Sequence, residues 1–318
     1  NLICCLILLI MRDETVFASP INGDRFSGCI CSNKGLFKTM KRLAIIAGKG
    51  QLPLDVAEAA TADGYDVLVL PIDGQADADF TSYQSSSIRL GSIGKTRSII
   101  TQHGIDQLVM VGKVIWPPIS GLLPDADGVK LLGKMTTRGD DTVLKLVTAY
   151  FVEKGIETVA PDRFLPGRKM PLGVIHNGIS ADQGAISPEG DGAIACGVAI
   201  LAALGTHDVG QSVIVQNRRV IAVEAAEGSD AMIARSASLL DPDGGIACFV
   251  KMAKIAQDLR LDVPVFGGDT VRAAAIAGLS LLAVEAETVL LADNLASIRT
   301  ICAEHSITLI GIERQGKP

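Results

Sequence analysis

The chain has 318 residues, which is enough for about two domains of ordinary size. Its 29 Lys and Arg residues against 35 Asp and Glu residues give a formal net charge of -6, which argues against a general nucleic-acid binder. Apolar residues make up 48% of the chain and aromatic residues 4%, so we expect an α/β enzyme rather than a disordered chain or a β-sandwich.

The first 39 residues lack the regular pattern of the rest. Their apolar run, Leu2–Ile10, is too short to span a bilayer, and no basic residue precedes it as in a signal peptide. We predict that residues 1–39 are an extension outside the folded core, with a membrane-proximal segment as the alternative. Beyond it, Cys196, Cys248 and Cys302 are predicted to be buried and reduced, as in a cytoplasmic protein.

Residues 41–160 alternate short apolar runs with helical stretches. Strands separated by helices predict βαβ units and a parallel sheet. We expect strands at Leu43–Ala47, Asp66–Pro71, Gln107–Val111 and Ile156–Ala160, and helices at Leu54–Ala62, Gly94–His103 and Asp140–Lys154.

The second half is also α/β, but its strand spacing is less regular. Residues 161–190 are rich in Gly, Pro and polar side chains, which predicts a linker or a large loop. Beyond them we expect helices at Asp191–Leu204, Ser229–Ser236, Thr270–Ala277 and Asn294–Glu304, and strands at Ser212–Gln216, Val220–Glu224, Ala247–Ala253, Val263–Phe266, Leu281–Val284, Val289–Leu291 and Thr308–Ile312.

Glycine-containing loops follow the strands of the first half. Gly48 and Gly50 lie between a strand and a helix, where backbone N–H groups can meet a phosphate, although a purely structural turn has the same pattern. Gly91–Lys95 and Gly112–Lys113 repeat this arrangement. Three such loops can converge on one crevice of a doubly wound sheet.

Two acidic segments are candidate metal or substrate sites. Asp140 and Asp141 precede a helix, where they either cap it or hold Mg²⁺ or a substrate group. Glu224, Glu227 and Asp230 lie where a strand ends and a helix begins. A solvated acidic turn with a cap is the alternative interpretation of this second segment.

The segment from 251 to 262 interleaves cations with carboxylates. Lys251, Lys254 and Arg260 alternate with Asp258 and Asp262 before an apolar strand. Such a mixture suits phosphate chemistry, because cations neutralise phosphoryl oxygens while a carboxylate holds a metal or orients water. A solvated charged loop would have a similar composition.

Seven segments in this order resemble one family. From about residue 41 to residue 313 the chain resembles the LpxI-type UDP-2,3-diacylglucosamine diphosphatases of lipid A biosynthesis. Each segment is weakly specific by itself, and the ordered set is highly specific. The segments are Ala47–Pro53, Gly91–Lys95, Gly112–Pro117, Arg138–Asp141, Asp208–Gln211, Ala222–Met232 and Lys251–Pro264.

The resemblance implies a fold and a reaction. It implies a Rossmann-like domain over residues 40–168, a catalytic α/β domain over residues 169–318, and a cleft between them. It implies a cytoplasmic hydrolase, dependent on Mg²⁺ or another divalent cation, that cleaves UDP-2,3-diacylglucosamine into UMP and 2,3-diacylglucosamine 1-phosphate. The expected partner is this substrate, without nucleic acid, with room for peripheral contact at the inner face of the inner membrane and for a homo-oligomer.

The family's essential aspartate falls on Asp262, which would hold Mg²⁺ or orient the attacking water. The remaining roles are hypotheses. Lys251, Lys254 and Arg260 are expected to stabilise developing charge, and Asp230 and Glu227 to complete the metal site with Asp262. The expected substrate-binding residues are Gly48, Gly50, Leu52, Pro53, Gly91, Gly94, Lys95, Gly112, Lys113, Asp140, Asp141 and Gln257.

The chain departs from the family's pattern at two places. Trp116 stands where the family often has Arg, and Ile255 and Ala256 replace a Pro-Gly pair. Two rival functions stay open. The first is a nucleotide-dependent oxidoreductase, against which the missing third glycine of the fingerprint speaks. The second is a nucleotide-sugar sensor that binds its ligand without turnover.

Overall fold

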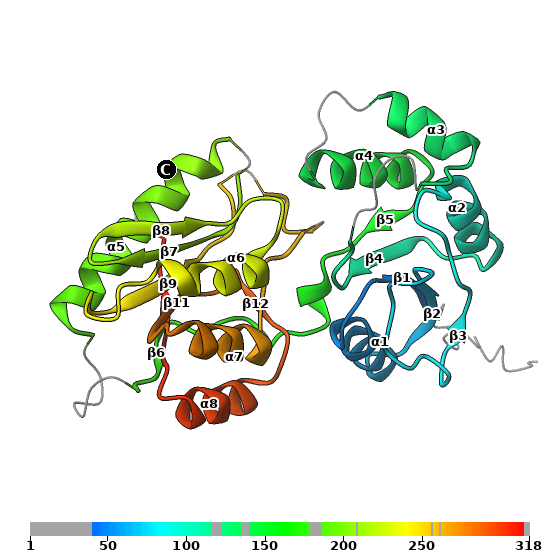
Figure 1. The fold of residues 1–318 in the computed structure, drawn as a ribbon. Coiled ribbons are helices and arrows are strands. Elements are labelled where there is room, and N and C mark those ends of the chain that lie inside the picture. The colour runs from blue at the N-terminus through cyan, green and yellow to red at the C-terminus, as the bar shows by residue number, and fades with distance from the viewer. Residues whose placement is uncertain are drawn as a thin grey trace, which may run out of the picture. The chain divides into compact units, whose positions relative to one another are not determined.

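Two large β-sheets, each with helices on both faces, organise the chain (Figure 1). The computed structural model describes residues 40–115, 122–134, 140–178, 186–207, 209–255, 257–260 and 262–314, and of residues 140–142 it describes the backbone alone. Met40–Pro318 forms one compact unit. The predicted extension over residues 1–39, together with Trp116 and Ala256, lies outside the described residues.

The first sheet is parallel throughout and has the strand order β3-β2-β1-β4-β5. This is the order of a doubly wound Rossmann sheet, so the predicted parallel sheet is confirmed. Its strands are β1 (Lys41–Ala47), β2 (Tyr65–Pro71), β3 (Gln84–Ser85), β4 (Gln107–Val111) and β5 (Glu157–Thr158), and its helices are α1 (Leu52–Ala62), α2 (Ile93–Gln102), α3 (Ala126–Gly133) and α4 (Asp140–Glu153).

Side chains of β1 alternate between two cores. Leu43 and Ile45 pack in one cluster with Val56 of α1, whereas Ala44 packs in another with Phe151 of α4. A strand that is buried on both faces needs apolar side chains at successive positions, which explains the continuous apolar run.

The second sheet is mixed, with the order β6-β13-β11-β9-β7-β8. β9, β11 and β13 are parallel neighbours, whereas β6 and β7 run antiparallel to the strands beside them. The strands of this half are β6 (Gly173–His176), β7 (Ser212–Gln216), β8 (Arg219–Val223), β9 (Ala247–Lys251), β10 (Val265–Phe266), β11 (Leu281–Glu285), β12 (Leu290–Leu291) and β13 (Thr308–Ile312), where β10 and β12 form a separate pair. Its helices are α5 (Pro188–Gly205), α6 (Ser229–Ser236), α7 (Gly268–Ala277) and α8 (Leu295–Glu304).

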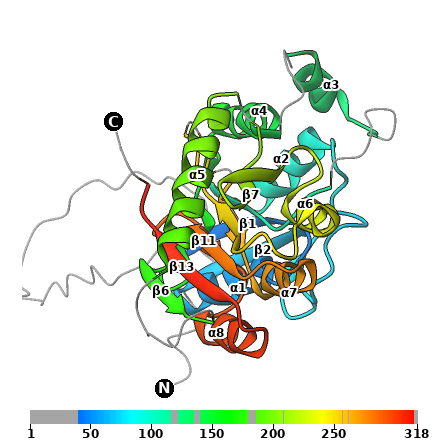
Figure 2. The same cartoon turned by 60° about the vertical axis from the view of Figure 1, so that its left-hand side comes forward.

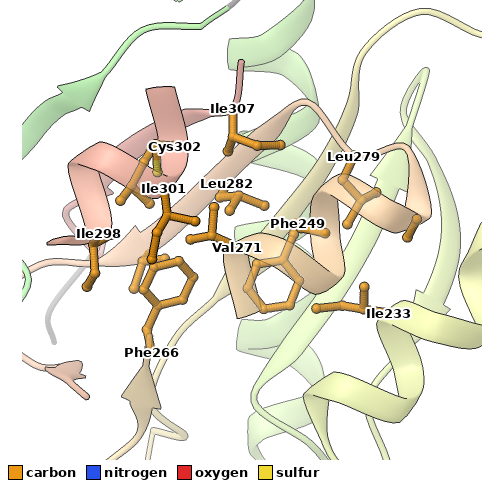
Figure 3. Packing of buried hydrophobic residues seen from close by; sticks show 14 of the residues in the cluster. Ile233, Phe249, Phe266, Val271, Leu279, Leu282, Ile298, Ile301, Cys302 and Ile307 are labelled. Atoms are coloured by element: carbon orange, nitrogen blue, oxygen red, sulfur yellow. The ribbon is translucent and has the colours of Figure 1, made fainter. Parts of the chain in front are cut away.

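Helices α6, α7 and α8 cover one face of this sheet. Figure 3 shows Phe249 of β9 and Leu282 of β11 among side chains of these helices, including Ile233, Val271 and Ile298. All five of these side chains are fully buried. Burial of large apolar side chains is the main stabilising contribution to such a core.

Helix α5 covers the opposite face (Figure 2). Its Ala193 and Leu201 are buried in a cluster with Val213 of β7 and Val250 of β9. Among the described helices, α5 has the length and apolar composition that a membrane span requires. Its contacts with β7 and β9 are those of a helix packed on a sheet.

The predicted burial of the cysteines is confirmed for two of three. Cys248 and Cys302 are buried free thiols, and burial raises the pKa of the Cys302 thiol to about 11. Cys196 lies on α5 and is only half-buried.

The stretch 161–190 differs from the predicted linker or loop. It contains β6, which pairs with β13, and the start of α5, where the Ser187 side chain accepts a hydrogen bond from the Gly190 N–H. β6 lies at the edge of its sheet and is only four residues long. A segment this short has no clear alternation of apolar and polar residues by which a strand is predicted. Helix α3 and strand β3 were not predicted either, and both are short.

Candidate active site

The glycine loops after β1 and β4 lie against each other. The Gly48 N–H donates to the Val111 carbonyl at 2.9 Å, and the Lys113 N–H donates to the Lys49 carbonyl at 3.0 Å. A Cβ atom on Gly48 would lie 2.7 Å from the Lys113 carbonyl oxygen, so this approach requires glycine. Two of the three loops that were predicted to converge are therefore adjacent.

The third loop, Gly91–Lys95, packs against the segment that leads into α3. A Cβ atom on Gly91 would lie 3.4 Å from the Pro124 Cα atom, and one on Gly94 would lie 3.0 Å from an Asp127 carboxylate oxygen. The Lys95 N–H donates to the Asp125 carboxylate at 2.9 Å. This backbone donor is thus already bound to a carboxylate of the protein.

The N-terminus of α1 begins with the predicted substrate-binding residues Leu52 and Pro53, and both are buried. Just before them, the Gly50 N–H donates to the Asp77 carboxylate at 2.7 Å. A protein carboxylate therefore occupies one of the N–H groups that were expected to meet a phosphate.

A hydrogen-bonded group of side chains gathers at the ends of β7, β8 and β9. We call Ser212, Glu224, Ser229 and Lys251 the Lys251 cluster. The Lys251 ammonium donates to the Ser229 hydroxyl at 2.9 Å, and the Ser229 hydroxyl lies 3.0 Å from the Glu224 carboxylate. The Ser212 hydroxyl also donates to Glu224, and Ser212 is the register partner of Lys251 across β7 and β9.

Opposed effects act on the Lys251 ammonium. Burial lowers the pKa of Lys251, while the negative charges of Glu224, Asp230 and Asp262 act in the opposite direction and the positive charge of Lys113 adds to the lowering. The net pKa stays below the usual value for lysine. A buried cation surrounded by carboxylates is typical of functional sites, although structural ion pairs have the same property.

Asp262 lies in the loop between β9 and β10 and is held by two amides. Its carboxylate accepts from the Gln257 side chain at 2.6 Å and from the Gln211 side chain at 3.4 Å. The Gln257 side-chain oxygen in turn accepts from the Lys254 N–H at 2.9 Å. Gln257 therefore orients Asp262 and ties it to the backbone at Lys254.

Lys113 connects the glycine loops to this region. Its ammonium lies 3.3 Å from the Asp230 carboxylate, and both side chains are more than half exposed. The predicted substrate-binding residue Lys113 and the predicted metal ligand Asp230 are thus direct neighbours. Because the pair is exposed, it contributes little to stability.

Glu227 and Arg260 have local partners. The Arg235 guanidinium donates to the Glu227 carboxylate at 2.8 and 3.1 Å and holds the pKa of Glu227 below its usual value. Arg260 donates to Asp258 at 2.7 and 3.0 Å, which lowers the pKa of the Asp258 carboxyl. These hydrogen bonds therefore hold the predicted metal ligand Glu227 and the predicted catalytic cation Arg260 on partners other than the Lys251 cluster.

The carboxylates offer a limited donor set for a metal. Within the ranges that the structure describes, no group of three His, Cys, Asp or Glu side chains is arranged around a common point. Mg²⁺ at phosphate sites is usually held by one or two carboxylates, with substrate oxygens and waters completing its shell. Two of the predicted ligands, Asp262 and Asp230, both act on the pKa of Lys251 and so lie in the same region of the structure.

Helix α4 flanks a pocket of about 650 Å³. Asp140 and Asp141 begin this helix, but their side chains lie outside the described residues. Thr148 and Thr158 line the pocket with buried hydroxyls that have no hydrogen-bond partner. The lining is completed by Lys145, Ala149, Val152, Gly155, Ile156, Glu157, Asp258 and Arg260.

Sequence reasoning missed part of the site. Gln211, Ser212 and Ser229 were not singled out, and Glu224 was only one of three neighbouring carboxylates. The available signal was indirect, because Gln211 and Ser229 both lie inside segments of the family pattern. Which side chains of these segments face Lys251 depends on the pairing of β7 with β9.

Comparisons with known proteins agree with one another. The family model of the LpxI N-terminal domain matches residues 42–168, and that of the LpxI C-terminal domain matches residues 180–310. The UDP-2,3-diacylglucosamine pyrophosphatase LpxI of Caulobacter vibrioides is 30% identical over 287 residues, which cover 88% of this chain and 100% of that protein.

Similar solved structures are more distant. A GalE-like L-threonine dehydrogenase from Cupriavidus necator is 12% identical with a TM-score of 0.29, covering 82% of this chain and 71% of that one. A UDP-N-acetylglucosamine 4-epimerase from Bacillus cereus is 11% identical with a TM-score of 0.28, covering 86% and 75%. These scores are too low to carry an argument about function.

Proposed function

The chain belongs to the LpxI family, and from this premise we propose that it hydrolyses the diphosphate of UDP-2,3-diacylglucosamine. The products are UMP and 2,3-diacylglucosamine 1-phosphate, and the reaction serves lipid A biosynthesis in the cytoplasm. One observation carries the proposal: the Asp262 carboxylate is held by two amides within electrostatic range of the buried Lys251 ammonium.

This arrangement suits attack of water on a diphosphate. Such a reaction needs an oriented water and neutralisation of the phosphoryl oxygens. Gln257 and Gln211 fix the direction of the Asp262 carboxylate, which can then orient the water. Lys251 supplies positive charge in the same region, and Lys113, which also acts on Lys251, adds to it.

We assign the metal to the same region. Asp262 and Asp230 are the residues that would hold Mg²⁺, and Glu227, bound by Arg235, is not needed for this partial shell. When bound, Mg²⁺ would supply further neutralisation of the diphosphate charge. The two acyl chains named in the relative's substrate favour peripheral contact of the protein with the inner membrane.

The direct test is turnover by the full chain. The protein is incubated with UDP-2,3-diacylglucosamine and Mg²⁺, and UMP and the acylated sugar phosphate are followed by mass spectrometry. We expect release of both products, abolished by EDTA. In water enriched in heavy oxygen, the product that gains the label identifies the attacked phosphorus.

Asp262→Asn separates catalysis from binding. The amide keeps the shape of the side chain but cannot accept a proton or carry negative charge, so we expect kcat to fall by about 10²- to 10⁴-fold. Asp243→Asn, at an exposed turn, is the matched control and should keep full activity. If the wild-type protein binds the substrate without turnover, the enzyme hypothesis is contradicted and the sensor hypothesis takes its place.

A further inference from the structure

Ser229 stands between a cation and an anion. It is the first residue of α6, and its hydroxyl contacts Lys251 from the end of β9 and Glu224 from the end of β8. A protonated lysine has three donors and no acceptor, so Lys251 donates and Ser229 accepts. The single Ser229 proton then points to the acidic side, either to Glu224 or to the Ser212 hydroxyl at 2.9 Å.

Ser212 closes this arrangement. Its own hydroxyl donates to the same Glu224 oxygen, and the Gln211 N–H adds a further hydrogen bond to that oxygen at 3.3 Å. Both serine hydroxyls therefore end on one carboxylate. Lys251 has only donors and must donate to Ser229, and the Ser229 proton reaches Glu224 either directly or through the Ser212 hydroxyl, which itself donates to Glu224.

The position of the ammonium group depends on this hydrogen bond. Lys251 is 7% exposed, and a buried ammonium needs a fixed acceptor because burial without one is costly. Three carboxylates attract it, those of Glu224, Asp230 and Asp262. The Ser229 hydroxyl gives the ammonium a defined partner among these competing charges.

We propose that Ser229 is a positioning residue, which accepts from Lys251 and donates to Glu224 and thereby fixes the ammonium where it can neutralise a phosphoryl oxygen. The inference rests on the proposed function, because it assigns Ser229 to the same reaction. Ser229 acts through Lys251 and need not touch the substrate.

Kinetics of three variants test the role. Ser229→Ala removes the acceptor, so we expect kcat to fall by about 10- to 100-fold, since a misplaced group costs rate rather than binding. KM should change by less than about 3-fold. Ser229→Thr keeps a hydroxyl and should restore kcat to within about 3-fold of wild type. Ser238→Ala, on an exposed serine near the end of α6, is the matched control.

A second measurement does not need substrate. The lysine side-chain signals of the full protein are recorded by NMR, and the Lys251 signal is assigned by its loss in Lys251→Met. Ser229→Ala should shift this signal, while Ser229→Thr and Ser238→Ala should leave it in place. If the wild-type protein turns over no substrate, the proposed function fails, and this measurement still shows whether Ser229 holds Lys251.

Three results would overturn the inference: an unchanged kcat in Ser229→Ala, an equal loss in Ser229→Thr, or an unmoved Lys251 signal. If Ser229→Ala does not fold, Ser229→Cys takes its place with the same expected losses, because a thiol is a weak acceptor of similar size.

Discussion

The phenol of Tyr150 donates to the Asp127 carboxylate at 2.5 Å. This bond lowers the pKa of Asp127, whereas burial and the same bond raise the pKa of Tyr150 to about 12. The stabilisation from Asp127 is present above its unfolded pKa of about 3.9 and is lost as the pH falls. That from Tyr150 is present below its unfolded pKa of about 10 and is lost as the pH rises through the folded value.

Tyr150→Phe should therefore lower the Tm at pH 7, where both contributions are complete. The difference in Tm from wild type should shrink progressively as the pH is lowered below the unfolded pKa of Asp127, because the carboxyl then takes up a proton and no longer gains from the phenol donor. Thermal unfolding followed by circular dichroism across a series of acidic pH values checks this. A loss of Tm that stays constant down to the most acidic value would contradict the assigned bond.

The residues of the site could be named from the sequence only in part. The family resemblance selects Asp262, and the charge pattern selects Lys251. The partners of Glu227 and Asp230 were not predicted. Glu227 is bound by the nearby Arg235, whereas Asp230 is bound by Lys113, which lies 117 residues away in the sequence. The second pairing is a tertiary contact, which composition and spacing do not encode.

Two glycines of helix α5, Gly192 and Gly197, allow the same substitution to be compared at an open position and at a packed position. A Cβ atom on Gly197 would lie 2.5 Å from the Val250 Cγ2 atom, whereas one on Gly192 would meet nothing within 4 Å. We expect Gly192→Ala to raise the free energy of unfolding by about 0.5–1 kcal/mol, through helix propensity. Gly197→Ala should lower it by about 1–3 kcal/mol, because the added methyl group overpacks the face on the sheet.

Denaturant unfolding of both variants measures the two free energies. Because the substitution is the same and the helix is the same, the sign of the effect isolates the contact with Val250. Destabilisation by Gly192→Ala would show that α5 packs differently along its first turns.

The strands with continuous apolar runs were predicted well, whereas some of the short elements were missed. β1, β2 and β4 carry continuous apolar runs, and each was expected within two residues of its observed bounds. β6 and α3 were missed because four residues at a sheet edge, or eight residues that include two Gly, give no clear period. The mixed second sheet could not be derived, since the antiparallel placement of β7 beside β9 is a non-local choice.

At the scale of the whole molecule, the two halves are in contact around residue 168, and we call this contact the seam. The Leu291 N–H donates to the Arg168 carbonyl at 2.6 Å, and the Arg168 guanidinium binds both the Asp55 carboxylate of α1 and the Ala292 carbonyl. Leu290 of β12 packs in the same core cluster as Leu43 of β1. The boundary between residues 168 and 169 stays a prediction, and it falls inside this seam.

Arg168→Ala should lower the free energy of unfolding by about 2–4 kcal/mol, because it leaves the poorly exposed Asp55 carboxylate without its partner. Arg89→Ala removes an exposed ion pair with Asp73 and is the control, with an expected effect below about 0.5 kcal/mol. Urea unfolding measures both. Equal effects would mean that the seam contributes no more than a surface pair.

The place of β13 in its sheet affects how the protein is made. Residues up to Thr158 complete the first sheet, so it can fold while the ribosome is still translating the second half. β6 leaves the ribosome early, but its partner strand β13 is made much later. Gly178 and Thr308, which form a hydrogen bond beside these two strands, are 130 residues apart in the sequence. At ordinary synthesis rates this wait is on the order of 10 s. During that time β6 is without its partner strand, so the newborn chain stays exposed to aggregation at this edge until β13 has been made.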